Sequence, residues 1–224
     1  MFGQKNWLTI LVTRGSLEIF GEGDSVIQRL PLPATVIDNL EVLNKDSLYI
    51  LITDWTKQKA YQDTEITWIL APELCFTHVI SSTGQDKIDS ETLQFLDTVP
   101  FEEIVSRTYS TSSGHLLVAT NKGLINALIQ GFSLHGYTTQ SVIPSQVIGI
   151  ESTLTPELAR NTHKRAAELK KESLIIPVAV ELKMAISPTT SGANPSKPKS
   201  SLPLLLSVFS ILVAILGFVL YLNQ

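Results

Sequence analysis

The sequence predicts an α/β domain followed by a linker and one transmembrane helix. Over the first 150 residues, short apolar runs typical of β-strands alternate with segments of helical periodicity. Residues 202–222 contain no charged side chain, and as a helix they would be about 31 Å long, close to the hydrocarbon thickness of a bilayer. Residues 187–201 are rich in Pro, Ser, Thr and Lys, which predicts a flexible linker between the two parts.

The chain is expected to open with three β-strands. Residues 7–13, 16–20 and 25–32 are rich in apolar and β-branched side chains. Arg14-Gly15 separates the first two strands, and a turn over 21–24 separates the second from the third. Short turns that contain glycine favour antiparallel pairing, so these strands predict a meander.

The next segments complete the predicted order β-β-β-α-β-α-β. Residues 35–44 carry apolar side chains at helical spacing. Residues 48–53 are almost wholly apolar, which favours a strand buried on both faces. A short polar helix is expected over 57–63 and a strand over 65–71, where Pro72 ends it.

A second, smaller αβ unit is expected from residue 74 onward. Its acidic helix should cover 84–98, and an amphipathic helix over 123–135 should end before Gly136, which suits a left-handed residue after a helix. The expected strands of this part cover 74–81, 103–110, 114–121 and 137–143.

The C-terminal third begins with a basic helix that runs from Thr155, its expected N-cap, to Lys171. The apolar segment 175–186 is compatible with either a strand or a helix. The predicted division of the chain is 1–73, 74–150, 151–186 (a helical extension), 187–201 (the linker) and 202–222 (the membrane anchor).

The anchor also predicts topology. Lys197 and Lys199 precede the apolar run, and positive charge favours the cytoplasmic side. We therefore expect a single-pass protein of the inner (cytoplasmic) membrane whose N-terminal domain is cytoplasmic; a buried core helix is the alternative interpretation of the run. The residues that mark the anchor along its length are Leu202, Phe209, Leu216 and Tyr221.

Composition and motifs argue against several functional classes. A net charge of −4 gives no electrostatic basis for nucleic-acid binding. Cys75 is the single cysteine, so the chain has no intramolecular disulfide and no cysteine-based metal site. The four histidines are scattered without metal-ligand spacing, and no nucleophile–base pair stands out. We expect no enzyme activity, no metal and no cofactor.

Several motifs give the sequence a family resemblance over residues 7–150. Thr9–Phe20 resembles the opening hairpin of the actin-like pilus and secretion proteins, which include PilM, the cytoplasmic part of GspL and, more distantly, FtsA. Trp68–Pro72 with Phe76, His115–Lys122 with the helix up to Gly136, and the region Phe95–Phe101 are similar to later segments of that family. The resemblance implies a partial actin-like (ribonuclease H-like) lobe with an inserted small αβ unit.

The chain also departs from this family. Thr13 stands where the family has an aspartate that helps to hold the metal and phosphates of ATP, and a neutral hydroxyl does not supply that charge. Thr13, Gly15 and Ser16 are thus a degenerate phosphate hairpin, and the nucleotide-binding second lobe has no counterpart among the roughly 50 residues between 150 and the anchor. The resemblance implies a reduced lobe that does not bind ATP.

The leading hypothesis is a membrane-anchored, non-catalytic scaffold of a type IV pilus or type II secretion-like assembly platform. Its expected partners are platform proteins, possibly another actin-like chain, and the lipid bilayer, but not nucleic acid. Two alternatives stay open: a nucleotide-responsive actin-like switch with residual binding, and a tail-anchored adaptor unrelated to pili.

Overall fold

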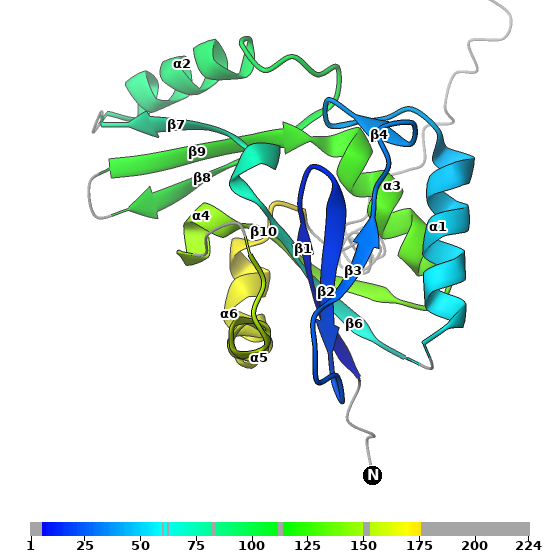
Figure 1. The fold of residues 1–224 in the computed structure, drawn as a ribbon. Helices are drawn as coiled ribbons and strands as arrows, with labels where there is room; N and C mark the ends of the chain where they lie inside the picture. Colours follow the sequence, from blue (N-terminus) through cyan, green and yellow to red (C-terminus); the bar gives the residue numbers. More distant parts are fainter. Residues whose placement is uncertain are drawn as a thin grey trace, which may run out of the picture. The chain divides into compact units, whose positions relative to one another are not determined.

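The mixed α/β prediction is confirmed by the arrangement of two larger sheets, a separate two-stranded hairpin and their helices (Figure 1). The computed structural model describes residues 6–59, 61, 63–81, 84–111, 114–149 and 153–175. All of these residues belong to one compact unit within 1–185. Residues 186–224 lie outside the described residues.

The larger sheet has five strands in the order β10-β6-β1-β2-β3. Strands β1, β6 and β10 are mutually parallel. Strand β2 is antiparallel to both of its neighbours, β1 and β3, so it is the one strand of this sheet that runs in the opposite direction. The bounds are Trp7–Val12 (β1), Ser16–Gly21 (β2), Gln28–Pro31 (β3), Glu65–Leu70 (β6) and Thr138–Pro144 (β10).

Strand β1 shows why helices cover both faces of this sheet. Leu8, Ile10 and Val12 belong to the main core, on the side of helices α1 (Lys45–Lys57) and α3 (Lys122–Ser133). The side chains between them point the opposite way: Leu11 packs in a second cluster, and the Thr9 hydroxyl donates to the Ala159 carbonyl of α5 (Pro156–Lys164) at 3.3 Å. Alternation along the strand therefore places two apolar layers on one sheet, and Figure 1 shows the helices on either side.

Aromatic rings fill the main core between the sheet and α3. Phe132, which is 1% exposed, lies 5.3 Å from the ring of Trp68 and 5.6 Å from that of Tyr137, both edge-on. Trp55 of α1 lies 5.8 Å from the same ring. Edge-to-face geometry is the favourable arrangement for such pairs, so this cluster joins α1, α3 and the sheet.

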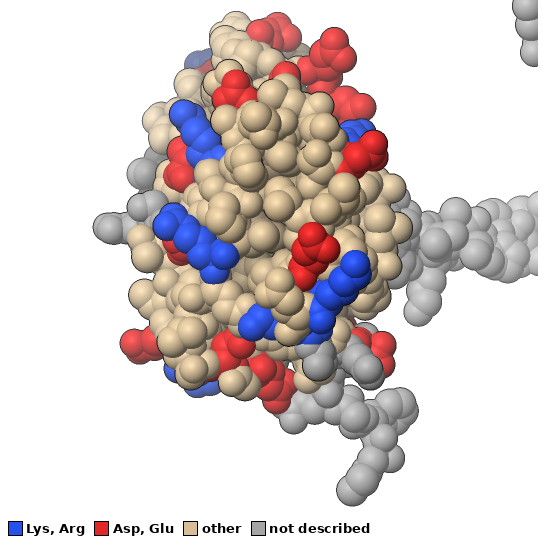
Figure 2. All heavy atoms as spheres, turned by 45° about the vertical axis from the view of Figure 1, so that its right-hand side comes forward, with Lys and Arg blue, Asp and Glu red and all other residues tan. Residues whose placement is uncertain are grey.

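Figure 2 shows the face of the molecule that lies toward the right-hand side of Figure 1. On that face of the molecule, charged side chains of both signs are interspersed among uncharged ones. Ile50 of α1 is 59% exposed, which is unusual for a residue in an otherwise apolar run.

The smaller sheet is antiparallel, with strand order β7-β9-β8. Helix α2 (Gln85–Leu96) lies over β7, where the His78 ring stacks on Phe95 at 5.6 Å. No residue of α2 is fully buried, so the helix covers its sheet loosely. The strands are Phe76–Ile80 (β7), Ile104–Thr111 (β8) and Gly114–Asn121 (β9), and the 3-10 turn η1 (Pro72–Leu74) leads into them.

The described chain ends in a segment that is bound to both sheets. Arg107 of β8 donates to the carbonyls of Lys171 and Ser173, at 2.6 and 2.8 Å. The Leu174 amide donates to the Val142 carbonyl of β10 at 2.8 Å. The helices that lead here are α4 (Ser145–Ile148), α5, α6 (Ala166–Leu169) and the 3-10 turn η2 (Lys170–Glu172). Thr155 caps α5 as predicted, but the predicted continuous helix is interrupted at Arg165.

Three predictions between the first and second sheets were wrong. Residues 35–44 form no helix but a hairpin of two short strands, β4 (Ile37–Asp38) and β5 (Glu41–Val42), whose turn residues Asn39 and Leu40 have φ of 47° and 64°. The expected strand at 48–53 lies inside α1, and α1 ends where a polar helix over 57–63 was expected. Asn44 explains the helix start, because its side chain accepts from the Ser47 amide at 2.9 Å.

The division of 1–186 into three parts stays a prediction. Residues 138–144, which fall in its second part, form β10 of the five-stranded sheet. Most of the apolar segment 175–186, the linker 187–201 and the transmembrane segment 202–222 lie outside the described residues. Within the part of the chain that the structure does describe, no helix combines the length and the apolar character needed to cross a membrane.

Candidate functional site

The predicted phosphate hairpin is the turn between β1 and β2, and the structure brings Thr13, Gly15 and Ser16 together there. The Ser16 amide donates to Thr13 Oγ1 at 3.1 Å, and the Thr13 hydroxyl donates to the Ser16 carbonyl at 2.9 Å. The Gly15 carbonyl accepts from the Leu32 amide at 2.8 Å. The Thr13 side chain therefore occupies the Ser16 amide, which is not free to donate to another acceptor.

Side chains beside the hairpin are also engaged. Arg29 Nε donates to Ser16 Oγ at 3.0 Å, and Arg29 Nη2 lies 3.7 Å from the half-buried Glu18 carboxylate. The other oxygen of Glu18 accepts from the Leu154 amide at 2.9 Å, just before α5. The guanidinium and the carboxylate thus serve the packing of β2 against its neighbours. The expectation that nucleotide does not bind here stays a prediction.

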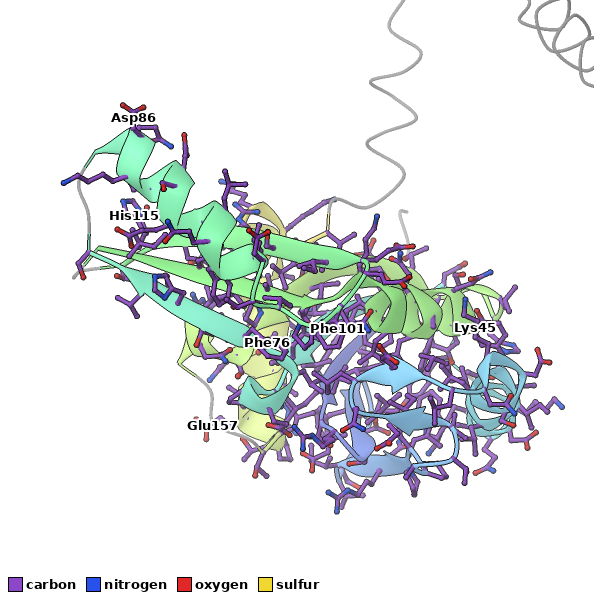
Figure 3. The ribbon with its side chains drawn as sticks, turned by 90° about the horizontal axis from the view of Figure 1, so that it is seen from above. Lys45, Phe76, Asp86, Phe101, His115 and Glu157 are labelled. Carbon is purple, nitrogen blue, oxygen red and sulfur yellow. The ribbon has the colours of Figure 1, made fainter. Side chains whose placement is uncertain are left out.

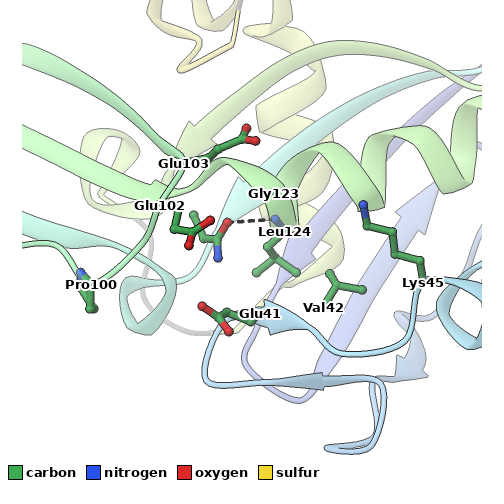
Figure 4. A pocket seen from close by; sticks show the side chains of 9 residues that line it. Glu41, Val42, Lys45, Pro100, Glu102, Glu103, Gly123 and Leu124 are labelled. Atoms are coloured by element: carbon green, nitrogen blue, oxygen red, sulfur yellow. Dashed lines mark hydrogen bonds between the residues drawn. The ribbon is translucent and has the colours of Figure 1, made fainter. Parts of the chain in front are cut away.

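A groove of about 590 Å³ lies at one end of the small sheet, beside the hairpin β4–β5 (Figure 4). It forms because the hairpin β4–β5, the first turn of α1, the segment before β8 and the first turn of α3 meet there. Its lining residues are Glu41, Val42, Lys45, Pro100, Glu102, Glu103, Asn121, Gly123 and Leu124.

The floor of the groove is formed by two apolar side chains, and hydrogen bonds at the start of α3 hold this part of the chain in place. Leu124 is 2% exposed, and Val42 is half-buried beside it. Asn121 fixes the start of α3, because its side-chain oxygen accepts from the Leu124 amide at 3.2 Å, as the dashed line in Figure 4 marks. The Lys122 amide donates to the Glu103 carbonyl at 3.0 Å, which joins the rim to the same helix end.

The rim of the groove carries three carboxylates against one ammonium group, that of Lys45, and is acidic on balance. Glu41, Glu102 and Glu103 are exposed, and Glu103 lies 3.8 Å from the ammonium group of Lys122. Among the described residues, no cation lies within 4.0 Å of the Glu41 or Glu102 carboxylate. Carboxylates are favourable beside the N-terminal ends of helices such as α1 and α3. A positively charged segment with an apolar side chain for the floor matches this chemistry.

Nothing in the sequence pointed to this groove. Its carboxylates come from position 41 and from positions 102–103. Acidic residues so far apart in the sequence are typical of an ordinary solvent-exposed surface and do not indicate a site. The turn at 39–40 that presents Glu41 was predicted as a helix. The signal that was available is Asn44, an N-cap residue directly before the run that forms α1.

Other candidate groups are separate from the groove. Cys75 is free, and burial raises the pKa of its thiol to about 12, so it is not a nucleophile at neutral pH. Across the described residues, no cluster of three or more His, Cys, Asp or Glu side chains is placed to hold a metal ion. The anchor residues Leu202, Phe209, Leu216 and Tyr221, and the flanking Lys197 and Lys199, lie outside the described residues.

Comparison with known proteins finds no matching family model and no matching curated protein. Among solved structures, the PilM-PilN type IV pilus biogenesis complex is similar with a TM-score of 0.45 and 11% identity, over 63% of this chain and 48% of that chain. The cytoplasmic domain of EpsL, an inner membrane component of the type II secretion system of Vibrio cholerae, gives a TM-score of 0.40 and 12% identity, over 63% and 58%.

A Bacteroides thetaiotaomicron protein of unknown function with an actin-like ATPase fold gives a TM-score of 0.34 and 11% identity, over 61% of this chain and 52% of that one. This chain therefore spans about half the length of the solved structures that it resembles. At this level, the likenesses concern the arrangement of strands and helices and identify neither a family nor a function for the chain.

Proposed function

We propose that this chain is a non-catalytic scaffold, held at the inner membrane by residues 202–222, that presents an actin-like lobe to a partner in a type IV pilus or type II secretion-like assembly platform. The groove between the hairpin β4–β5 and the end of the small sheet is the proposed partner site. Its occupant is a segment of the partner that carries a basic residue next to an apolar one. The observation that carries this proposal is the acidic rim around an apolar floor.

Strand order supports the actin-like part of the proposal. Counted along the chain, the strands of the larger sheet lie in the order 3-2-1-4-5, and the second runs against the others. Ribonuclease H-like lobes use this arrangement. The small unit β7-α2-β8-β9 enters between the fourth strand, β6, and the helix that leads to the fifth strand, β10, which agrees with the insertion that the sequence motifs imply.

The chemistry of the groove supports binding of a protein segment rather than of a small substrate. The groove is open, with exposed carboxylates at its rim and one apolar patch at its floor. Complementary charge across such a surface favours one partner over others and speeds association. The hairpin Thr13–Ser16 supports a lobe without nucleotide chemistry, because its hydroxyl and amide groups bond to one another.

Affinity purification with matched charge variants tests the proposal. The tagged, full-length, detergent-solubilised chain is isolated from its own cells in three forms, and the proteins that co-purify are quantified by mass spectrometry. The forms are the wild type, the groove variant Glu41→Lys/Glu102→Lys, and the control Asp86→Lys/Asp89→Lys. The control makes the same charge change on α2, where Figure 3 shows Asp86 far from Lys45 of the groove.

We expect a pilus or secretion platform protein in near-stoichiometric amount with the wild type and the control. The groove variant should recover at least about tenfold less of it, because two attractive charges become repulsive. A wild-type sample without any platform protein contradicts the assignment to such an assembly. Equal recovery of the same partner by all three forms contradicts the groove as the site.

A further inference from the structure

Charge is unevenly distributed along this chain. Residues 1–152 contain nine Lys and Arg against seventeen Asp and Glu, whereas residues 153–224 contain eight against four. A protein that is acidic overall therefore has a basic C-terminal third. Most of that charge falls on α5, α6 and η2, at Arg160, Lys164, Arg165, Lys170 and Lys171.

Packing turns these basic side chains outward. Ala159, Thr162, Ala166 and Leu169 are buried against the larger sheet and its neighbours, and they alternate with the basic positions at helical spacing. All five basic residues are exposed. The helices therefore present one apolar side to the protein and a basic side to the surroundings.

Two of the five cations are engaged with other groups. Arg165 is bound to the Glu168 carboxylate at 3.0 and 3.1 Å, and the Arg160 guanidinium lies 5.1 Å above the ring of Phe20. Among the described residues, no carboxylate lies within 4.0 Å of Lys164, Lys170 or Lys171. We call these three lysines the basic face.

The groups that face this surface do not cancel its charge. Glu172 is directed to Arg107, 3.5 Å away, and Glu168 is neutralised by Arg165. His163 stacks on Trp7 at 4.5 Å, and its burial lowers its pKa, so it is neutral at physiological pH. Glu157, at the start of α5, is the remaining exposed carboxylate on these helices.

We infer that the basic face rests on anionic lipid headgroups of the membrane to which the chain is anchored. The inference rests on the proposed anchor, because only 26 residues separate Ile175 from Leu202. As a random coil, a chain of that length would have a root-mean-square span of about 28 Å, a distance that would keep the face close to the headgroups. Clustered lysines next to a membrane anchor are attracted by the negative surface potential of an anionic leaflet.

This orientation leaves the groove free for a partner. In Figure 3, Lys45 of the groove and Glu157 at the start of α5 lie on different sides of the unit. Docking through the basic face would therefore fix which way the groove points relative to the membrane. A lobe that only hung on its linker would present the groove in all directions.

Flotation separates the anchor from the basic face. The full-length chain is mixed in detergent with lipid, the detergent is removed, and the resulting vesicles are separated from free protein by flotation in a density gradient. The vesicles contain either phosphatidylcholine alone or phosphatidylcholine with roughly one third phosphatidylglycerol. Flotation with both lipids is expected and supports the anchor. If the chain floats with anionic vesicles but not with neutral ones, the result contradicts the membrane anchor. It supports lipid binding by the basic face if the variant Lys164→Glu/Lys170→Glu/Lys171→Glu no longer floats with the anionic vesicles. Flotation with neither overturns both.

Lysine footprinting then tests the face in vesicle-bound protein. Acylation rates of Lys164, Lys170 and Lys171 are measured by mass spectrometry and normalised to Lys57, Lys59 and Lys87 on other elements. We expect roughly fivefold slower acylation of the basic face in anionic than in neutral vesicles, and loss of the difference at about 0.5 M salt, where the Debye length falls to a few ångströms.

Two outcomes of the footprint overturn the inference. Equal rates in both lipids show that the face is free of headgroups. Slow rates in both lipids, which rise when the protein is diluted in the vesicles, show that the lysines contact a second copy of the chain instead. The triple variant Lys57→Glu/Lys59→Glu/Lys87→Glu serves as the charge-matched control. Its acylation rates are normalised to Lys45 and Lys122, which it retains, and its basic face should keep the wild-type protection.

Discussion

Gly131 of α3 packs directly against side chains of α1, and it allows a quantitative test of how the two helices pack. A Cβ atom added at Gly131 would lie 2.5 Å from Cδ1 of Ile52 and 3.3 Å from Cδ1 of Tyr49. Ordinary contact between carbon atoms is about 3.5–4.0 Å. Ile52 is 0% exposed, so its methyl group has no free space into which it can move.

Two opposing effects set the stability of Gly131→Ala. Alanine in a helix interior is favoured over glycine by about 1 kcal/mol. Forcing an extra carbon into a packed interface costs about 1–3 kcal/mol. We expect the overlap to win, with a net loss of about 1 kcal/mol in the free energy of unfolding.

Ile52→Val removes the clashing Cδ1 atom and makes the test specific. Alone it should cost about 1 kcal/mol, the usual value for a buried Ile→Val change. In the double variant the alanine Cβ fills the space that Cδ1 leaves, so its stability should return close to that of the wild type. The expected coupling energy is about 2 kcal/mol, within the range for residues in contact.

Guanidinium chloride unfolding of the full-length chain in detergent, followed by near-ultraviolet circular dichroism, measures these four stabilities. The aromatic signal reports on the core, because Trp55 and Trp68 both pack on Phe132 of α3. Additive effects of the two substitutions, or a Gly131→Ala variant as stable as the wild type, would refute the close approach of α1 and α3.

Three further predictions concern other parts of the described chain. Burial raises the pKa of Cys75 to about 12. At pH 8, iodoacetamide should therefore alkylate the folded chain roughly a thousandfold more slowly than it alkylates a free thiol. Alkylation as fast as that of glutathione would contradict the burial of Cys75. Leu40→Gly should destabilise the chain by about 2 kcal/mol, because the loss of the buried side chain outweighs relief of the strain at its positive φ. The neighbouring Asn39 is exposed, so Asn39→Gly should leave the stability unchanged in the same unfolding assay. ATP with Mg²⁺ should leave the thermal unfolding midpoint unchanged, because Thr13 occupies the Ser16 amide; a concentration-dependent rise would instead show nucleotide binding.

Strands and helices with a strong period could be predicted from the sequence. Strand β9 matches its expected bounds, and β1, β6 and α3 agree within one or two residues at each end, which is ordinary precision for element boundaries. Each has a glycine, proline or N-cap signal beside a clear apolar pattern. For these elements, local preference and tertiary packing point to the same structure.

Helix α1 shows where local pattern fails. Residues 48–53 are apolar and partly β-branched, a composition that also suits a buried strand. Tertiary packing favours the helix over the strand here. Leu48, Ile52 and Trp55 recur at helical spacing on the side that meets the main core, while Ile50 is left exposed. The same holds for Leu40, whose positive φ is tolerated because its side chain is buried.

The groove was beyond sequence reasoning for a different physical reason. Glu41 and Glu102 are brought to one rim because β9 ends at the start of α3, beside the hairpin β4–β5 and the first turn of α1. That juxtaposition depends on where tertiary packing places the hairpin β4–β5 and α1 relative to the small sheet, and no spacing of residues encodes it. The degenerate hairpin at Thr13, by contrast, is formed by neighbours in sequence and was located from them.

Site-specific photo-cross-linking tests the central claim, that the groove is where a platform partner binds. A photoreactive phenylalanine analogue replaces Lys45, which is exposed at the groove, or Leu93, which is 66% exposed on α2. After irradiation in intact cells, the cross-linked peptides are identified by mass spectrometry. We predict that the Lys45 position captures a basic segment of a pilus or secretion platform protein and that the Leu93 position does not. Capture of that protein from Leu93 alone, or of no protein from Lys45, would contradict the account.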